Sequence, residues 1–345
     1  MTLAIALGGC AAATPDWATI AAANPAPTVT ASRETDAVAT ANADAADDPA
    51  IWRNAADPAA SLIVGTDKRA GLHVYGLDGR DRHFVDAGRV NNVDLIETRI
   101  GGEPAVLVAA SDRNDLAAAR IALFRLDTAA ARLVPIGTVA AGAGEAYGIC
   151  LAARGDGVDA FMVVKDGTIN QVAIDLSGAA PSGRIVRTMK LASQSEGCVV
   201  DPRTRRLYVA EEDVGIWRFD AAPDGATTAV PVARVDGRTL VADVEGLAIA
   251  PEGAGAGGWL IASSQGDNAF SVYSLADDRY VGRFRIAAGA LGAVSETDGI
   301  EVARGGFGPD FPDGVMVAQD GDNAPVAQNF KIVDWRQVRR ALGLR

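Results

Sequence analysis

Histidine, cysteine and lysine are scarce in this chain of 345 residues, and their scarcity excludes several kinds of active site. The only two histidines, His73 and His83, lie too close together in the sequence to suit a nucleophilic histidine site or a Ser-His-Asp triad. No cysteine lies in a phosphate-cradling loop, and no GxxxxGKS or GxxxxGKT segment is present. Any hydrolytic chemistry therefore needs another source, and metal-activated water is the simplest one.

Long apolar runs, aromatic residues and net positive charge are missing as well. No apolar run reaches the roughly 18 residues that a transmembrane helix needs, so the sequence predicts no membrane span. Aromatic residues make up 6% of the chain while glycine occurs 38 times, which favours tight turns over long helices. The formal net charge of −12 argues against nucleic acid or an anionic membrane as a partner, because either needs a basic surface. An anionic substrate would need bound cations to reverse the local field.

Residues 1–46 are rich in Ala, Thr, Pro and Asn and show no steady period. Cys10 follows Leu7, Gly8 and Gly9 after a short apolar run, an arrangement that resembles the lipobox of a bacterial lipoprotein signal. We interpret the segment as a signal or lipoprotein-like leader followed by a flexible linker. This interpretation predicts an exported protein, either periplasmic, attached to the outer membrane as a lipoprotein, or extracellular.

The other two cysteines, Cys150 and Cys198, follow similar glycines at distances that differ by one residue. In strands, an offset of one residue places side chains on opposite faces. We therefore expect two buried thiols and no disulfide between them.

From Asp47 onward, the sequence repeats six times. Each unit is an apolar strand that ends in small residues, then a polar turn and a second, alternating strand. The units begin at Leu62, Ala105, Phe161, Arg206, Trp259 and Gly314. A short motif precedes each unit: DDPAIW, NNVDLI, EAYGICL, SEGCVV, DVEGLAI and ETDGIEV. The glycines at positions 148, 197, 246 and 299 are separated by 49, 49 and 53 residues, a period typical of propeller blades.

The sequence therefore predicts an all-β fold, a six-bladed β-propeller formed by residues 47–345. Alternating βα units would need helical patterns between the strands, and only the tail from Asp334 has such a pattern. A closed propeller has only short strand edges with which to pair another copy, which favours a monomer.

A motif that precedes the first strand of every blade lies at one mouth of the central channel. The six motifs supply the carboxylates Asp47, Asp48, Asp94, Glu145, Glu196, Asp243, Glu245, Glu296 and Asp298. So many carboxylates in one funnel repel each other, and their pKa values rise unless cations lie among them. All-oxygen ligands of this kind favour calcium, with magnesium or manganese as lesser candidates.

The turns after the first strands are expected to open at the same mouth. They carry the basic residues Lys68, Arg69, Arg113 and Lys165 and the acidic or amide residues Glu211, Glu212, Asp320, Asp322 and Asn323. The chain has only four lysines, and two of them lie in these turns. Cations and carboxylates around one funnel indicate a site for a small polyanion held partly through metal ions, and phosphate esters fit this description.

In order and spacing, these motifs resemble those of the β-propeller phytases from Asp47 to about Trp335. The matching strings are DDPAIW, TDKRAGL, NNVD, EAYG, SQSEG, AEED, DVEGL, SSQG, TDGIEV and AQDG. The resemblance implies hydrolysis of phytate (inositol hexakisphosphate) as its calcium complex, at a calcium cluster beside two phosphate sites, with Glu212 also acting in catalysis. The implied calcium ligands are Asp47, Asp48, Glu196, Glu212, Asp243, Glu245 and Asp298. The implied phosphate-binding and catalytic residues are Lys68, Arg69, Arg113, Tyr147 and Lys165. A separate structural calcium would join Asp94 to Asp320, Asp322 and Asn323.

Two positions depart from the family's pattern. Arg69 stands where the family more usually has a lysine, which changes the geometry of phosphate binding. Gly292 stands where the family often has an acidic residue, so one calcium site is expected to be weaker or missing. Two other functions remain open at this point: a lactonase-type calcium propeller, and a binding propeller without catalysis, because a fold does not fix a function. A lactonase-type site has no need for Lys68, Arg113 and Lys165 beside the metal.

Overall fold

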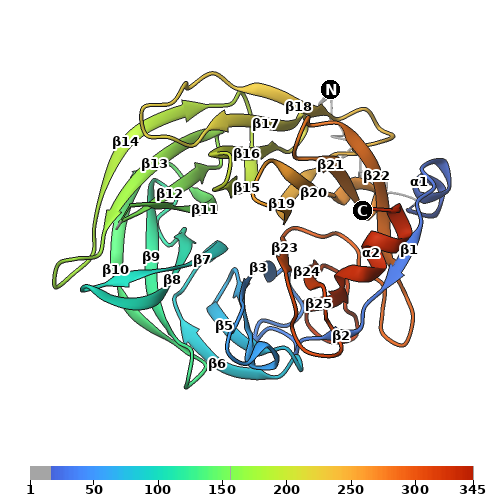
Figure 1. Cartoon of the computed structure of the whole chain (residues 1–345), viewed down its shortest axis with the longest axis horizontal. Coiled ribbons are helices and arrows are strands. Elements are labelled where there is room, and N and C mark those ends of the chain that lie inside the picture. The colour runs from blue at the N-terminus through green and yellow to red at the C-terminus, as the bar shows by residue number, and fades with distance from the viewer. Residues whose placement is uncertain (1–16, 156, 345) are drawn as a thin grey trace, which may run out of the picture.

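The computed structural model describes residues 17–155 and 157–344, which form six β-sheets arranged as blades around a central axis (Figure 1). The predicted six-bladed β-propeller is confirmed. Each blade has four antiparallel strands, and the fifth blade has one further strand on its outer edge. The first strand of each blade lies nearest the axis, so the motif at its start faces the channel.

The first three blades are built from consecutive strands. Blade 1 comprises β3 (Ala46–Trp52), β4 (Leu62–Asp67), β5 (Gly71–Gly76) and β6 (Asp81–Asp86). Blade 2 comprises β7 (Val90–Ile100), β8 (Glu103–Asp112), β9 (Ala118–Asp127) and β10 (Arg132–Ala143). Blade 3 comprises β11 (Ala146–Arg154), β12 (Gly157–Val164), β13 (Thr168–Asp175) and β14 (Ser182–Lys190).

Blade 4 is also built from consecutive strands: β15 (Ser195–Asp201), β16 (Arg206–Glu211), β17 (Gly215–Asp220) and β18 (Val230–Arg234).

The last two blades each take one strand from the N-terminal segment. Blade 5 comprises β19 (Val244–Glu252), β20 (Gly257–Ser264), β21 (Ala269–Ser274), β22 (Tyr280–Ala287) and β1 (Thr28–Thr30). Blade 6 comprises β23 (Ile300–Arg304), β24 (Gly314–Asp320), β25 (Asn329–Asp334) and β2 (Arg33–Glu34).

The core is divided between the blades, because adjacent blades cover both faces of the inner strands. All residues of β4 and β5 are buried, whereas the outer strand β6 alternates between exposed and half-buried residues. At the junction of blades 1 and 6, Ile63 and Tyr75 pack with Phe330 and Ile332. Strands covered on both faces read as continuous apolar runs, which explains the first strands of the sequence repeat.

The segment predicted to be a linker closes the ring. Strand β1 pairs in parallel with β22, and β2 forms the outer edge of blade 6 by pairing with β25 (Figure 1). The prediction of a flexible linker up to residue 46 is therefore wrong for this stretch, because strands of three and two residues leave no periodic signal in a sequence. The predicted lipobox at Cys10 lies outside the described residues.

Cys150 on β11 and Cys198 on β15 form a disulfide, with a Cα–Cα distance of 5.7 Å. The prediction of two separate thiols is wrong. Its argument holds within one sheet, but β11 and β15 are the inner strands of adjacent blades. Adjacent blades contact each other through opposite faces of their sheets, so side chains on opposite faces meet between blades 3 and 4.

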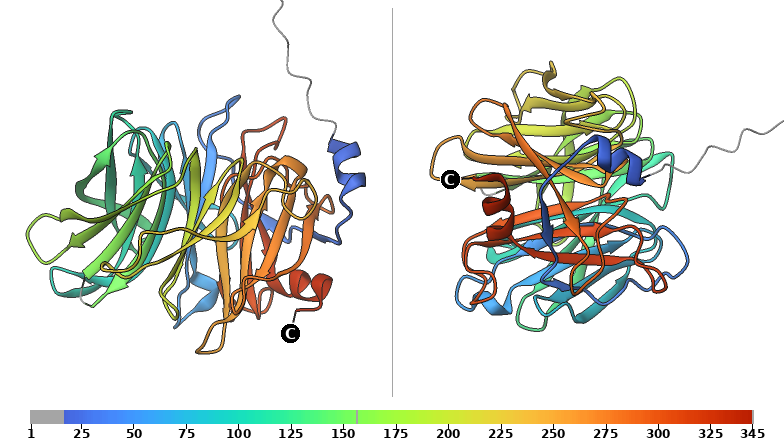
Figure 2. Two further views of the ribbon diagram at one scale, coloured as in Figure 1. Left: turned by 90° about the horizontal axis from the view of Figure 1, so that it is seen from above. Right: turned by 90° about the vertical axis from the view of Figure 1, so that its right-hand side faces the viewer.

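Two helices lie on the outside of the ring (Figure 2). Helix α2 (Trp335–Leu342) follows the last strand, as the tail pattern predicts; Asp334 caps its start by accepting a hydrogen bond from the Arg336 nitrogen. Helix α1 (Trp17–Ala23) precedes β1, and two 3₁₀ turns, η1 (Pro58–Ala60) and η2 (Gln265–Asp267), complete the helical elements described. Within residues 17–155 and 157–344, neither helix has the length and apolar character needed to cross a bilayer.

Candidate active site at the channel mouth

Glycines in the repeated motifs let the inner strands approach one another closely at the mouth. A Cβ atom on Gly148 would lie 1.9 Å from the carbonyl oxygen of Glu196 in the next blade. The pairs Gly197–Glu245, Gly246–Asp298 and Gly299–Asp47 make the same contact around the ring. The glycine period found in the sequence thus has a physical cause: a side chain at these positions would push apart the strands that carry the carboxylates.

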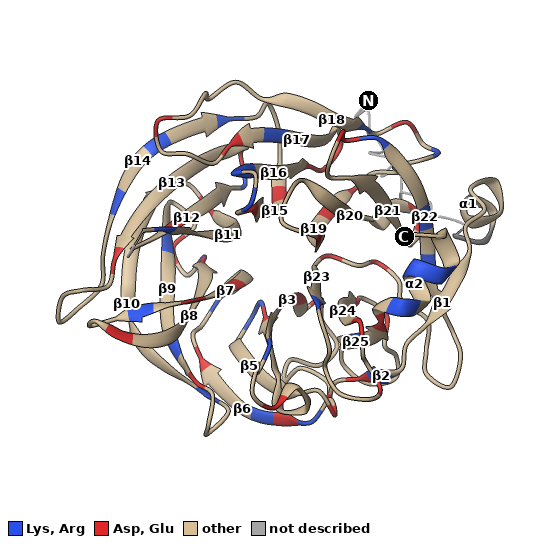
Figure 3. Cartoon of the chain, in the orientation of Figure 1, with Lys and Arg blue, Asp and Glu red and all other residues tan. Residues whose placement is uncertain are grey.

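Three carboxylates, those of Glu196, Glu212 and Glu245, converge at the mouth, with one oxygen of each within 4.8 Å of the others. All three side chains are buried, and Figure 3 shows the acidic residues of β15 and β19 beside the central opening. Burial, followed by repulsion from neighbouring carboxylates, raises the pKa of Glu196 and Glu245 well above the usual range. Burial also raises the pKa of Glu212 to about 7. Among the described residues, Glu212 Oε1 and Glu245 Oε2 have no hydrogen-bond partner, so they are free to bind a cation.

Lys68 holds a second group of carboxylates together. Its Nζ atom lies 2.8 Å from Asp298 Oδ2, 2.9 Å from Asp44 Oδ2 and 3.0 Å from Asp47 Oδ2. Burial disfavours the charge on Lys68, but the three carboxylates outweigh this effect and hold its pKa above the ordinary value. Burial raises the pKa of Asp298 to about 7 although Lys68 opposes the shift. Gln265 Nε2 donates to the other oxygen of Asp298 at 2.7 Å.

Arg113, Lys165 and Tyr147 form a cationic wall on the blade 2 and blade 3 side of the mouth. Lys165 Nζ lies 4.7 Å and Arg113 Cζ lies 5.6 Å from the centre of the Tyr147 ring. Arg113 also pairs with Glu145 Oε1 at 3.0 Å. Burial and the neighbouring glutamates raise the pKa of Tyr147, so its hydroxyl stays protonated and can donate. The wall therefore presents two cations and one hydroxyl donor.

Asn91 connects this wall to the carboxylate cluster. Its side-chain nitrogen donates to Glu196 Oε1 at 2.9 Å, and its side-chain oxygen accepts a hydrogen bond from Arg113. The Asn91 side chain is buried. Basic side chains and carboxylates thus meet in one hydrogen-bonded network at this mouth.

Asp48, Asp94 and Glu301 lie deeper in the channel, around a cavity of about 30 Å³. Asp48 Oδ2 accepts a hydrogen bond from the Val93 nitrogen at 3.0 Å, and Asp94 Oδ2 accepts one from the Leu151 nitrogen at 2.7 Å. Burial raises the pKa of Asp94 to about 7 and that of Glu301 to about 8. The space suits a single ion or a water or two, and the carboxylates around it offer oxygen donors.

The predicted structural calcium site is divided. Lys331 Nζ lies 3.1 Å from Asp320 Oδ2 and 3.0 Å from Asn323 Oδ1, and Asp322 is exposed. Asp94 makes its contacts in the channel instead. Asp94 and the residues of the last blade thus have different partners among the described residues, and the buried ammonium of Lys331 lies beside Asp320 and Asn323.

The remaining predicted residues lie at the rim of the mouth. Asp243, Glu296 and Asp298 line a hollow of about 630 Å³. Burial and then a neighbouring aspartate raise the pKa of Asp243. The side chain of Arg69 lies at this rim, and its Nε donates to the Asp44 carbonyl at 2.8 Å. A ligand larger than one phosphate group can therefore extend from the cluster into this hollow and past Arg69.

Sequence reasoning missed four residues of the mouth and channel, namely Asp44, Asn91, Glu301 and Gln194, whose Nε2 donates to Tyr147 Oη at 3.4 Å. Asn91 and Gln194 belong to motifs that carry recognised residues, but neither has a charge to draw attention. Glu301 had a usable signal, since it is an acidic residue between Ile300 and Val302 in a first strand that lines the channel. Asp44 lies in the segment interpreted as a linker.

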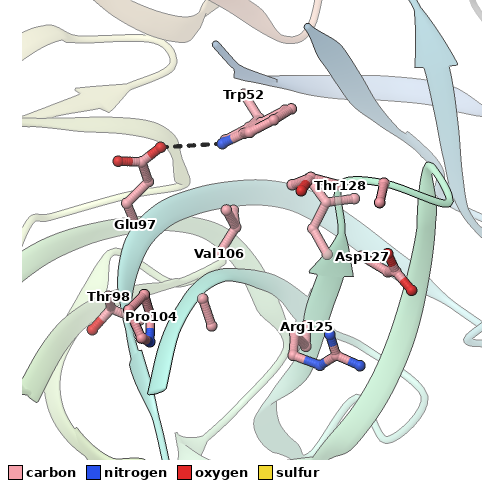
Figure 4. Close-up of a pocket in the computed structure, with 11 residues that line it drawn as sticks. Trp52, Glu97, Thr98, Pro104, Val106, Arg125, Asp127 and Thr128 are labelled. Atoms are coloured by element: carbon pink, nitrogen blue, oxygen red, sulfur yellow. Dashed lines mark hydrogen bonds between the residues drawn. The ribbon is translucent and has the colours of Figure 1, made fainter. Parts of the chain in front are cut away.

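A separate hollow of about 420 Å³ lies between blades 1 and 2 (Figure 4). Its lining includes Trp52, whose Nε1 donates to Glu97 Oε1 at 3.2 Å, and Arg125. Strand β3 begins at Ala46, next to Asp47 at the mouth, and ends at Trp52, so this hollow lies at the far end of the strands. None of the predicted site residues lines it.

The fold and the mouth together define a class of protein. It is a six-bladed β-propeller in which a cluster of buried carboxylates, able to hold a metal ion, lies beside a wall of basic side chains. Comparisons with known proteins identify the family. The family model described as Phytase matches residues 1–345. The chain is 40% identical over 331 residues to the 3-phytase of Bacillus subtilis (strain 168), a match that covers 91% of this chain and 85% of that protein.

The chain therefore belongs to the phytase family and is a phosphoric monoester hydrolase. Among solved structures, a chain of the Mitotic Checkpoint Complex crystal structure matches with a TM-score of 0.48 at 12% identity, covering 95% of this chain and 87% of that one. A chain from the crystal structure of BBS1N in complex with ARL6DN matches with a TM-score of 0.46 at 12% identity, covering 79% of this chain and 74% of that one. At these values neither adds to the assignment.

Proposed function

We propose that this phytase depends on calcium ions, held by the carboxylates of the mouth beside the phosphate group that is cleaved. Hydrolysis of phosphate monoesters of phytate follows from membership of the family. The choice of calcium, the positions of the ions and the roles of individual residues are inferred from the geometry.

The observation that carries the proposal is the convergence of Glu196, Glu212 and Glu245 with two of their oxygens unpaired among the described residues. Three buried carboxylates within 4.8 Å repel each other strongly when ionised. Divalent ions remove this repulsion. Carboxylate oxygens on several separate strands suit calcium, which accepts six to eight oxygen ligands in flexible geometry, whereas magnesium demands a stricter octahedron.

The side chains around the cluster divide the remaining tasks. Arg113 and Lys165 are placed to neutralise the oxygens of a phosphate group, and the Tyr147 hydroxyl to donate to it. Bound calcium would lower the pKa of a coordinated water and offset the charge that develops on the phosphate. Lys68 and Arg69 lie next to the hollow lined by Asp243 and Asp298. A second phosphate group of the same substrate would replace a carboxylate partner of Lys68 there.

Two variants test the proposal at the cluster and at the wall. Glu212→Ala and Lys165→Ala are each expected to lower phosphate release from phytate by about 100-fold or more, in the range seen when one charge-stabilising group is lost. Glu97→Gln, at the far hollow, is the matched control and is expected to keep the wild-type rate. Wild-type turnover by Glu212→Ala, with folding confirmed by circular dichroism, would contradict the proposal. A lactone substrate assayed in parallel tests the lactonase-type alternative, for which we expect no activity.

We also propose that the protein is exported and works as a monomer. The disulfide between Cys150 and Cys198 supports an oxidising compartment, since such bonds are rare in the cytosol. The closed ring of blades, with short free edges, supports a monomer. Cell fractionation of the full-length chain and light scattering of the purified protein test these two points; cytosolic retention or a stable dimer would contradict them.

A further inference from the structure

The buried side chain of Glu211 accepts four hydrogen bonds from backbone, serine and tryptophan donors. Glu211 is the last residue of β16 and is 1% exposed. Its Oε1 accepts from the Ala192 nitrogen at 3.0 Å, from the Ser193 nitrogen at 2.8 Å and from Ser193 Oγ at 2.7 Å. Its Oε2 accepts from Trp217 Nε1 at 2.7 Å. One carboxylate oxygen thus holds the turn of residues 192–195, and the other holds the neighbouring strand.

The turn held in this way carries two residues into the active site. The Gln194 carbonyl accepts a hydrogen bond from the Glu212 nitrogen at 3.1 Å, and Gln194 Nε2 donates to Tyr147 Oη at 3.4 Å. Glu196 follows the turn directly and belongs to the carboxylate cluster. Gln194 therefore lies between the cluster and the cationic wall.

The sheet alone does not fix Glu196. The pairing of β15 with β16 is regular from Cys198 to Asp201 and resumes only at Ser195, with an irregularity between Ser195 and Cys198. Glu196 lies in this irregular stretch, where the backbone lacks a ladder partner to define its position. Asn91 holds the Glu196 side chain from one side by its hydrogen bond to Oε1. The turn before Glu196 restrains its backbone from the other side, and Glu211 holds that turn.

Blade 1 uses the same arrangement. Asp67 is the last residue of β4, as Glu211 is the last residue of β16. The carboxylate of Asp67 accepts from the nitrogen and hydroxyl of Thr40, both at 2.9 Å, and from the Arg69 nitrogen at 3.1 Å. In both blades, a buried carboxylate at the end of the second strand holds a segment of the mouth that carries functional side chains.

We propose that Glu211 is a positioning residue for the phosphatase reaction: it touches neither substrate nor metal, and it fixes the turn of residues 192–195 so that Gln194 and Glu196 face Tyr147, Glu212 and Glu245. This inference rests on the proposed function in one respect: its effect on the calcium requirement assumes that the cluster binds calcium. Loss of the Glu211 carboxylate misplaces Glu196 in the cluster, which weakens metal binding and turnover together. Loss of a residue that hydrogen-bonds a metal ligand generally has this effect.

The test is Glu211→Gln in the full-length chain. The amide keeps the shape but presents an NH₂ group either to the two backbone N–H groups of the turn or to Trp217 Nε1, which are all donors, so one side loses its acceptor. We expect kcat for phytate to fall about 10- to 100-fold, and the calcium concentration for half-maximal activity to rise about 10-fold. Ser193→Ala removes only the Oγ bond and is expected to shift both quantities in the same direction by less. This milder variant keeps the test open if Glu211→Gln does not fold.

Asp201→Asn is the matched control. Asp201 is also 1% exposed and lies at the other end of β15, where it pairs with Arg203 at 2.8 Å, away from the mouth. We expect a lower melting temperature for this variant, with wild-type kcat and wild-type calcium requirement. The inference is overturned if folded Glu211→Gln and Ser193→Ala keep both the kcat and the calcium requirement of the wild type, or if Asp201→Asn changes them equally. A wild-type enzyme that works fully in chelator would instead refute the calcium proposal, and the effect of Glu211→Gln on kcat would then decide the positioning role alone.

Discussion

Lys68 and Asp298 are 230 positions apart in the chain, and their side chains meet at 2.8 Å across the junction of the first and last blades. The Lys68 ammonium also contacts Asp47, whose side chain is 1% exposed. Removing one partner of a buried ion pair leaves the other charge uncompensated, which is strongly destabilising. The contact therefore closes the ring electrostatically at the mouth, where we propose that the substrate binds.

From this contact we predict that Lys68→Met lowers the free energy of unfolding of the metal-free protein by about 3 kcal/mol. Urea denaturation in the presence of chelator measures the change. Lys190→Met is the control, because Lys190 is 52% exposed and its pair with Asp166 lies at the surface; we expect it to cost less than about 1 kcal/mol. Equal effects of the two substitutions would show that the Lys68 contacts do not hold the ring together.

Gly148→Ala is predicted to disturb the mouth by steric contact alone. Its Cβ would lie 1.9 Å from the Glu196 carbonyl oxygen, which is backbone and cannot turn aside. We expect a loss of about 1–3 kcal/mol in the free energy of unfolding, as for other overpacking changes, together with weaker calcium binding by calorimetry. Gly292→Ala is the control, since a Cβ at that position would meet no atom of the described residues within 4 Å. An unchanged calcium affinity in Gly148→Ala would count against the close approach of the strands.

The Cys150–Cys198 disulfide is predicted to stabilise the fold without taking part in the reaction. It joins residues separated by 48 positions, and loops of this size usually give about 3–4 kcal/mol. The double variant Cys150→Ser with Cys198→Ser should therefore melt several degrees lower while keeping its phytase rate at room temperature. If oxidised and reduced wild-type protein melt at the same temperature, the disulfide contributes nothing to stability.

The channel carboxylates predict how stability depends on pH in the absence of metal. The pKa of Glu301 is about 8 in the folded protein against 4.5 in the unfolded chain, and that of Asp94 is about 7 against 3.8. Between these values, the folded state keeps protons that the unfolded state has lost, so stability falls as pH rises from about 4 to about 8. The stability of the Glu301→Gln variant, whose amide does not titrate, should fall less steeply with pH. Melting temperatures at pH 5 and pH 8 with chelator measure the slope; equal slopes for the two proteins would contradict the assignment.

The sequence was sufficient for the features that repeat. The glycine period located the blades, and the acids beside those glycines, such as Glu196 and Glu245, reach the mouth because every blade starts there. Contacts that depend on how distant segments of the chain meet could not be predicted from the sequence. Nothing in the local sequence says that Lys331 lies between Asp320 and Asn323, or that the short strand β2 pairs with β25.

The disulfide also depends on how separate strands are arranged in space. The alternation of side chains along strands predicts opposite faces for Cys150 and Cys198, but the consequence depends on which sheet each strand joins. The contacts of Asn91, Gln194 and Glu211 were not predicted, because their partners come from other blades or turns and leave no signal in the local sequence.

The central claim is that divalent ions among Glu196, Glu212 and Glu245 make phytate hydrolysis at this mouth feasible. The most direct test is phosphate release from phytate by protein stripped of metal, measured while calcium is added back step by step. We predict no release before addition, and recovery to the full rate as calcium binds, with magnesium restoring less. Full phosphate release by the stripped protein, unchanged when calcium is added, would contradict the account.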